Sequence, residues 1–244
     1  MNNDKRFAVL IDADNVSDRY IKNIMDELAN EGIVTYKRIY GDWTKPALAS
    51  WKNVLLNHSI TPIQQYSYTT GKNATDSAMI IDAMDILYSG NVEGFCIVSS
   101  DSDFTRLASR LRESGMYVIG MGERKTPQPF VNACNRFKYL EVISGSLDKE
   151  KKSQGESIEH VSDFMPPDAV KKAIFTILDE VSDEDGWALL SEVGNILIKR
   201  CPSFDVRNYG YSKLTPFVDS LNAFDISSIP GAKGGVKYIY IKKK

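Results

Sequence analysis

Short hydrophobic runs alternate with amphipathic stretches along the first 143 residues of the chain. The run at residues 7–11 is hydrophobic at every position, which is typical of a strand buried on both faces of a parallel sheet. In the stretch at residues 17–31, hydrophobic residues recur at helical spacing, and Gly32 stands where a C-terminal cap belongs. A strand followed by a helix is therefore the repeating unit.

The same unit recurs up to residue 143. The expected strands cover residues 7–11, 33–40, 62–68, 94–99, 116–122 and 139–143. The expected helices cover residues 17–31, 46–57, 76–88, 102–113 and 128–135. This alternation predicts an α/β fold with a Rossmann-like, mostly parallel sheet that is covered by helices on both faces. In such a sheet the active site lies at the carboxyl ends of the strands.

The pattern lapses into polar residues after residue 143. The segment at residues 144–165 is rich in Ser, Lys and Glu and ends beside Pro166 and Pro167, which indicates a linker. It separates an expected N-terminal domain at residues 5–143 from an expected C-terminal domain at residues 166–244.

The expected C-terminal domain has a different pattern from the first. Its helices are expected at residues 169–181, 187–199 and 209–222. Two β-like runs follow on either side of a glycine-rich turn, at residues 224–229 and 235–241. Three short helices and a hairpin favour a small winged helix.

Composition argues against several classes of protein. No hydrophobic run approaches the ~20 residues of a membrane span, and no signal-peptide core precedes the first strand. The net charge is −2, from 30 Lys and Arg against 32 Asp and Glu, which excludes a uniformly basic nucleic-acid coat protein. The three cysteines are widely spaced and form neither a disulfide framework nor a zinc motif. We therefore expect a cytoplasmic protein without membrane association.

Acidic residues stand where expected strands end or expected helices begin. These residues are Asp12, Asp14, Asp76, Asp101 and Asp103. Carboxylates that meet at one edge of a sheet repel one another unless a divalent cation lies among them. Because the ligands are oxygen atoms and the chain has only two histidines, neither beside the acids, Mg²⁺ or Mn²⁺ is favoured over zinc.

Such an ion would suit the hydrolysis of a phosphodiester, because it lowers the pKa of a bound water and holds a phosphate oxygen. Asn15 would orient a water molecule or the phosphate without adding charge. Ser99 and Ser100 precede an expected helix, whose N-terminus favours a bound phosphate. Lys72 and Arg124 are further candidates for contact with substrate phosphates, although each could equally be an exposed loop charge.

Structural roles compete with these chemical ones. Asp76 and Asp103 could simply cap the helices that they open, and Asp14 is as consistent with a capping or supporting role as with metal binding. Asp12 and Asp101 end hydrophobic runs, where an unpaired charge is costly. These two acids therefore carry most of the metal-site hypothesis.

Three motifs contain these acids. They are Ile-Asp-Ala-Asp-Asn at residues 11–15, Lys-Asn-Ala-Thr-Asp at residues 72–76 and Val-Ser-Ser-Asp-Ser-Asp-Phe at residues 98–104. In order and spacing they resemble the signatures of NYN domains, the LabA-like branch of the PIN-like nucleases, over about residues 5–143. Ser100, where the family often has Gly, and the Asn-Ala-Thr run are departures that leave the acids intact.

Members of this family look like Mg²⁺-dependent ribonucleases with a Rossmann-like sheet. The resemblance therefore implies that Asp12, Asp76, Asp101 and Asp103 bind metal and that Asn15 is the polar residue of the catalytic site.

Two motifs of the second domain resemble those of LOTUS domains, also called OST-HTH domains. They are Trp-Ala-Leu-Leu-Ser-Glu-Val at residues 187–193 and Tyr-Gly-Tyr-Ser-Lys-Leu at residues 209–214. The resemblance implies a winged helix that binds RNA or protein. Tyrosines that stack on bases and lysines that meet phosphates would suit RNA. The candidate contacts are Tyr209, Tyr211, Lys213, Lys233 and Lys237. The alternative is that the two tyrosines pack the core of this domain.

The leading hypothesis is a divalent-metal-dependent endoribonuclease whose first domain cleaves RNA while the second holds or selects it. An adaptor that binds RNA or protein without turnover is the main alternative. A phosphatase is a third hypothesis, because Asp12-Ala13-Asp14 matches the Asp-x-Asp start of haloacid-dehalogenase enzymes, but no matching Ser/Thr and Lys set follows. Protein partners of the second domain and a homodimer remain open.

Overall fold

A computed structural model describes residues 4–66, 74–145, 164–230 and 237–244 of the chain. The chain divides into two compact units, Met1–Gly155 and Glu156–Lys244. Among the described residues, no helix combines the length and hydrophobicity that a membrane crossing requires. The greater part of the expected linker, the glycine-rich turn, Lys72 and Lys233 lie outside the described residues.

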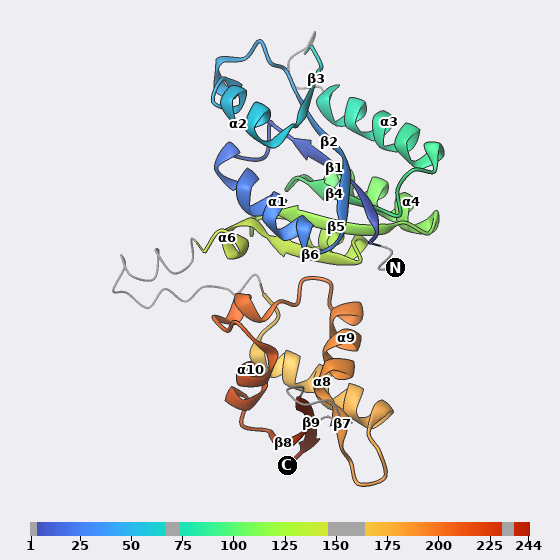
Figure 1. The fold of residues 1–244 in the computed structure, drawn as a ribbon, viewed down its shortest axis with the longest axis vertical. Helices are drawn as coiled ribbons and strands as arrows, with labels where there is room; N and C mark the ends of the chain where they lie inside the picture. The colour runs from blue at the N-terminus through green and yellow to red at the C-terminus, as the bar shows by residue number, and fades with distance from the viewer. Residues whose placement is uncertain (1–3, 67–73, 146–163, 231–236) are drawn as a thin grey trace, which may run out of the picture. The chain divides into compact units, whose positions relative to one another are not determined.

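The first unit is built on a six-stranded sheet (Figure 1). The strands are β1 (Arg6–Asp12), β2 (Ile33–Gly41), β3 (Thr61–Gln64), β4 (Gly94–Val98), β5 (Tyr117–Gly122) and β6 (Arg136–Tyr139). They lie in the order β3-β2-β1-β4-β5-β6, and each neighbouring pair is parallel. The central strands β1 and β4 are buried almost throughout, as the hydrophobic runs predict. The predicted α/β fold with a parallel sheet is confirmed.

Helices cover both faces of this sheet. They are η1 (Asp18–Tyr20), α1 (Ile21–Ala29), η2 (Pro46–Leu48), α2 (Trp51–His58), α3 (Ala74–Ser89), η3 (Ser102–Phe104), α4 (Thr105–Glu113), α5 (Gln128–Ala133) and α6 (Leu140–Ile143). Figure 1 shows α1, α2 and α6 on one side of the sheet and α3 and α4 on the other. Right-handed crossovers require this arrangement, because the chain moves outward from β1 to β3 and then returns over the opposite face to β4.

The predicted strand at residues 139–143 is wrong. Strand β6 ends at Tyr139, and the following residues form α6. In β6, Lys138 is only 2% exposed, and its ammonium lies 2.7 Å from carboxylate oxygens of both Glu27 and Glu31. Arg136 also pairs with Glu31, at 2.8 Å. Charged residues that are buried in ion pairs hide this strand from a pattern based on hydrophobicity.

The second unit combines short helices with a small antiparallel sheet (Figure 1). Its helices are α8 (Pro167–Val181), α9 (Leu190–Arg200), η4 (Val206–Tyr209) and α10 (Leu214–Ser220), and its strands are β7 (Ala188–Leu189), β8 (Phe224–Pro230) and β9 (Lys237–Lys243). The strand order is β7-β9-β8. The first two predicted helices and the paired strands are confirmed, but β7 occupies the start of the helix predicted at residues 187–199. The two residues of β7 pair with β9, which lies far along the chain, so the local sequence pattern does not indicate this strand. The helix predicted at residues 209–222 is shorter, because η4 ends at Tyr209, Gly210 has a positive φ, and α10 begins only at Leu214.

Candidate functional site

Asp12 is the last residue of β1, at the carboxyl edge of the sheet, and is 1% exposed. Its carboxylate accepts hydrogen bonds from the backbone N–H of Asp14 at 3.1 Å, the side-chain amide of Asn15 at 2.7 Å and the hydroxyl of Ser99 at 2.8 Å. Burial raises the pKa of Asp12, while the bonds from Asn15 and Ser99 oppose that rise. These donors hold the Asp12 carboxylate in one orientation.

Ser99 connects Asp12 to the acids that follow β4. Its hydroxyl oxygen accepts a hydrogen bond from the backbone N–H of Asp101 at 3.1 Å. Asp101 in turn caps η3, because its carboxylate accepts the backbone N–H of Asp103 at 2.9 Å. The capping role that the sequence suggested for Asp103 thus belongs to Asp101.

Three carboxylates meet beside Asp12. Asp76 lies in the first turn of α3, and it offers one oxygen that lies within 4.8 Å of one oxygen from Asp101 and one from Asp103. Burial raises the pKa of Asp76 to about 6, and the charges of Asp12, Asp101, Asp103 and Asp14 add to the rise. Asp12 is outside the group of three, yet its charge is the strongest that acts on Asp76. The fold therefore brings together three of the four predicted metal ligands, and Asp12 lies outside their group.

The three converging oxygens fit a hard divalent cation. Opposite ligands of one Mg²⁺ lie about 4.2 Å apart, so small side-chain rotations bring oxygens within 4.8 Å of one another to coordination distance. The group contains only carboxylates, which suits a hard cation better than zinc. A bound cation would also relieve the repulsion that contributes to the raised pKa of Asp76.

The residues predicted to contact phosphate differ in their exposure, because the two serines are buried and Arg124 is partly exposed. Ser99 is fully buried and already donates and accepts hydrogen bonds, so it supports the acids and does not face a substrate. Ser100 is also buried, and its hydroxyl accepts the backbone N–H of Glu123 at 2.8 Å. The backbone N–H of Arg124 donates to the carboxylate of Glu141 at 3.0 Å. Arg124 itself is partly exposed. Substrate contact by Arg124 remains a prediction.

Lys45, in the loop after β2, is a residue of this region that does not stand out in the sequence. Its ammonium is 3.3 Å from one carboxylate oxygen of Asp14. The other oxygen of Asp14 accepts a hydrogen bond from the hydroxyl of Thr75 at 3.2 Å. Asp14 therefore holds together three segments at the carboxyl edge of the sheet. The sequence alone gives no sign of this contact, because it follows from the pairing of Tyr40 with Asp12 in the folded sheet.

In the C-terminal unit, both candidate tyrosines pack on the core. The ring of Tyr209 stacks on Phe217 with centroids 4.7 Å apart, and that of Tyr211 meets Phe217 edge-on at 5.6 Å. The hydroxyl of Tyr209 donates to the backbone carbonyl of Met165 at 2.8 Å. The alternative expectation, that these tyrosines pack the core, describes their environment better than base stacking does.

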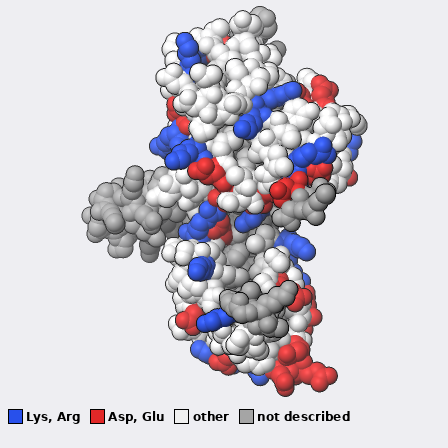
Figure 2. Space-filling view, in the orientation of Figure 1, with Lys and Arg blue, Asp and Glu red and all other residues white. Residues whose placement is uncertain are grey.

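Two of the candidate lysines, Lys213 and Lys237, are exposed, and Lys233 lies outside the described residues. Lys213 precedes α10, and Lys237 lines a mainly apolar groove of about 390 Å³ with Leu190, Ile198 and Leu214. Figure 2 shows acidic side chains gathered at one end of the unit, over the turn between α8 and β7. The face of the first unit that is in view carries interspersed positive and negative side chains.

Residues 6–141 match the family model of the NYN domain, and residues 166–236 match that of the OST-HTH/LOTUS domain. No curated protein matches the chain.

Two solved structures of proteins without an assigned function are similar to parts of it. A crystal structure from Vibrio parahaemolyticus is 20% identical, with a TM-score of 0.47, and the match covers 56% of this chain and 93% of that one. A solution NMR structure from Nitrosomonas europaea is 29% identical, with a TM-score of 0.29, and the match covers 38% of this chain and 85% of that one.

The NYN match spans more than half of the chain and contains the converging acids Asp76, Asp101 and Asp103. The OST-HTH/LOTUS match follows it in the expected order. The chain belongs to the NYN domain family and carries an OST-HTH/LOTUS domain after its NYN domain.

Proposed function

We propose that the NYN domain is a divalent-metal-dependent endoribonuclease and that the OST-HTH/LOTUS domain holds or selects the RNA. The observation that carries the proposal is the meeting of Asp76, Asp101 and Asp103 at the carboxyl edge of a nuclease-type domain. We expect Mg²⁺ or Mn²⁺, because carboxylate oxygens prefer hard cations.

Each acid has a distinct part in this proposal. A bound divalent ion supplies activation of water and neutralisation of charge at the phosphodiester. Asp76, Asp101 and Asp103 would hold that ion, with Asp103 exposed enough also to position a water molecule. Asp12 adds negative charge beside them. Asn15, predicted to orient water or phosphate, would act mainly through Asp12, because its amide donates to that carboxylate.

The site needs little rearrangement for this role. Asp101 is fixed by Ser99 on one side and by the N–H of Asp103 on the other. Preorganised groups contribute more to catalysis than mobile ones, because their orientation is set before the reaction. Asp76 would take up a proton near pH 6 and release it when a cation binds, since its pKa is raised to about 6 without one.

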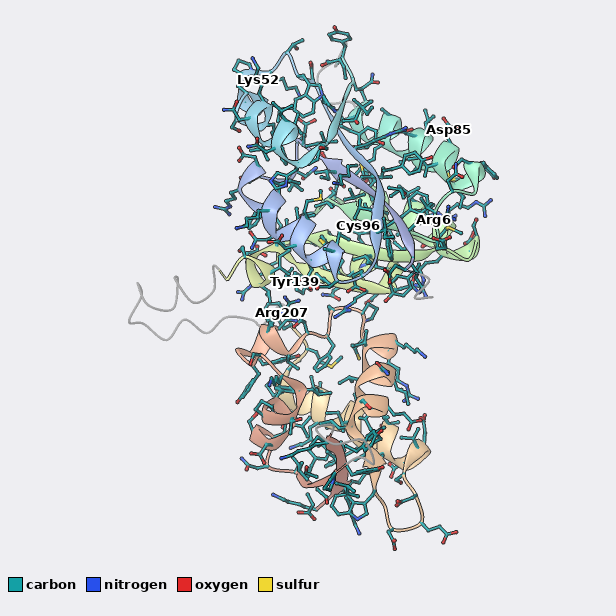
Figure 3. The ribbon with its side chains drawn as sticks, in the orientation of Figure 1. Arg6, Lys52, Asp85, Cys96, Tyr139 and Arg207 are labelled. Atoms are coloured by element: carbon teal, nitrogen blue, oxygen red, sulfur yellow. The ribbon has the colours of Figure 1, made fainter. Side chains whose placement is uncertain are left out.

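The proposal for the C-terminal domain is supported by its family and by its exposed lysines, Lys213 and Lys237. We also propose a cytoplasmic location. It is supported by the three cysteines, which are free thiols, and Figure 3 shows one of them, Cys96, within the sheet.

Incubation of the full chain with labelled single-stranded and folded RNAs tests this function. Samples would contain Mg²⁺, Mn²⁺ or EDTA, and the variants would be Asp12→Asn and Asp101→Asn. The control is Asp85→Asn, which removes the same charge from the exposed side of α3 (Figure 3). We expect cleavage that requires the ion, falls roughly hundredfold or more in both site variants, and persists in the control.

Two outcomes would contradict the proposal. RNA binding without product under every ion condition would favour the adaptor. Cleavage that continues in EDTA, or in folded Asp101→Asn protein, would separate activity from the acidic site. Circular dichroism of each variant shows whether it is folded.

A further inference from the structure

The loop that carries Lys45 is held in one conformation by its own side chains. Asp42 accepts hydrogen bonds from the backbone N–H and hydroxyl of Thr44, at 3.2 and 2.6 Å, and from the amide of Gln64 at 3.0 Å. The indole of Trp43 donates to a backbone carbonyl of β3 at 3.0 Å. The backbone N–H of Lys45 donates to the carbonyl of Asp42 at 3.0 Å. The position of Lys45 is therefore set by a rigid support.

From this loop, Lys45 reaches towards the acidic site. Its ammonium pairs with Asp14 at 3.3 Å, and Asp14 accepts the hydroxyl of Thr75 at 3.2 Å. Thr75 directly precedes Asp76 in α3. Asp14 also lies near enough for its charge to act on Asp76. Lys45 is therefore a cation held at the margin of the converging acids.

The ion pair with Asp14 leaves much of the Lys45 side chain available, because 42% of it is exposed. An ammonium has three protons, and a separation of 3.3 Å is longer than the ~2.7–2.9 Å of a strong charge-assisted hydrogen bond. Exposed pairs of this kind contribute little to stability. The small contribution of this ion pair to folding stability therefore does not explain why the rigid loop places a lysine beside Asp14.

The charge of Lys45 would favour the binding of an anionic substrate. A phosphodiester that approaches several carboxylates is repelled, and a nearby cation offsets that repulsion. A lysine suits a phosphate because it acts as a compact point charge with several donors. Asp14 suits the task of holding it, because its two oxygens face Lys45 and Thr75.

We propose that Lys45 binds a phosphate of RNA beside Asp76, Asp101 and Asp103, and that Asp14 positions Lys45 for this contact. The inference rests on the proposed nuclease function for the choice of ligand. It makes Lys45 a substrate-binding residue and Asp14 a positioning residue.

The test measures RNA binding separately from cleavage. Fluorescence anisotropy with a labelled single-stranded RNA in EDTA would be recorded over a range of salt concentrations. The full chain would be compared with Lys45→Gln, Lys45→Arg and Asp14→Asn. Lys52→Gln is the matched control, since Lys52 is exposed on α2 (Figure 3).

We expect Lys45→Gln to lower RNA affinity roughly three- to tenfold and to reduce the salt slope by about 0.7, the value for one phosphate contact on a single strand. Lys45→Arg should restore most of the affinity, because it keeps the charge. Asp14→Asn keeps the charge of Lys45 and should leave the slope unchanged. Lys52→Gln should match the wild type.

A Lys45→Gln variant with wild-type affinity and slope would overturn the inference, whether or not the protein cleaves RNA. Equal losses of thermal stability in Lys45→Gln and Lys45→Arg, with the slope unchanged, would also overturn it and indicate a structural role. Lys45-dependent binding without cleavage in Mn²⁺ would support the inference while contradicting the nuclease function. A wild-type chain that does not bind RNA would contradict both.

Discussion

Ser99 donates a hydrogen bond of 2.8 Å to the buried carboxylate of Asp12, and this contact joins the ends of the two central strands of the sheet. The same hydroxyl oxygen accepts the backbone N–H of Asp101 at 3.1 Å. Because Ser99 is fully buried, water has no ready access to replace it. One hydroxyl therefore helps to set the positions of two acids.

Replacing Ser99 with Ala should weaken both the fold and the metal site. Asp12 would lose a buried donor, which costs about 1–3 kcal/mol in the free energy of unfolding. Affinity for Mn²⁺ should fall roughly 10- to 100-fold, as it does when a supporting contact of a metal site is removed. Urea unfolding and Mn²⁺ titration measure the two effects.

Ser109→Ala is the matched control, because the Ser109 hydroxyl donates to a carbonyl of its own helix at 3.0 Å. It should change stability by no more than about 0.5 kcal/mol. If Ser99→Ala and Ser109→Ala behave alike, the hydroxyl of Ser99 does not support the acids.

Asp76 should make the metal-free domain less stable as pH rises. Its pKa is about 6 in the folded chain and about 3.9 in an unfolded one, so the folded state holds more protons between these values. The free energy of unfolding therefore falls as pH rises from about 4 to about 6. Since Asp76 is partly exposed, solvent screening reduces the expected effect to roughly 1–2 kcal/mol.

Asp76→Asn isolates this contribution. In EDTA at pH 7.5 the variant should be more stable than the wild type by that amount, and near pH 4 the two should agree. Asp85→Asn, on the exposed side of the same helix, should follow the wild type. Urea unfolding across this pH range gives the comparison. A difference in the free energy of unfolding between Asp76→Asn and the wild type that does not change with pH would contradict the prediction.

Mn²⁺ should stabilise the NYN domain, and more so at pH 7.5 than at pH 5. A ligand at 100 times its Kd adds about 2.7 kcal/mol to the free energy of unfolding. Below pH 6 a proton on Asp76 competes with the ion, which weakens binding by up to about tenfold per pH unit. Thermal unfolding with and without Mn²⁺ measures this effect.

Two variants sharpen this metal test. Asp101→Asn should abolish the stabilisation, whereas Asp14→Asn should keep most of it, because Asp14 contacts Lys45 and Thr75. Equal loss in the two variants would make Asp14 a metal ligand.

Tyr209 should contribute mainly to the stability of the C-terminal domain. Tyr209→Ala removes a ring that stacks on Phe217 and should cost roughly 2–4 kcal/mol. Tyr209→Phe removes the hydrogen bond to Met165 and should cost about 0.5–1.5 kcal/mol. Tyr238→Ala, at an exposed ring of β9, should change stability by less than about 1 kcal/mol. A Tyr209→Ala protein with normal urea stability but weaker RNA binding would instead assign the ring to base stacking.

The sequence predicts the parallel sheet because its central strands are hydrophobic on both faces. Strands β1 and β4 can be recognised from their own hydrophobic residues, without information about the neighbouring strands. Strand β6 is different, since Lys138 is buried only by virtue of ion pairs with Glu27 and Glu31, more than 100 positions away. Strand β7 likewise depends on its pairing with β9. The errors occur where a distant segment decides the local structure.

The same distinction applies to the site. Asp12 and Asp101 stand out in the sequence because each follows a hydrophobic run. The different environments of these two acids cannot be recognised in the sequence. The donors around Asp12 and the meeting of Asp101 with Asp76 arise only in the folded sheet. Lys45 escapes notice for the same reason, because its closeness to Asp14 follows from the pairing of β1 with β2.

The strand order also determines when the acids can converge during translation. Asp12 and Ser99 are 87 positions apart, and β4 joins β1 only after β2, β3 and α3 have been synthesised. A nascent chain that stops before β4 thus has Asp12 and Asp76 but neither Ser99 nor Asp101. The group of three carboxylates can therefore form only after β4 and the residues that follow it have been added.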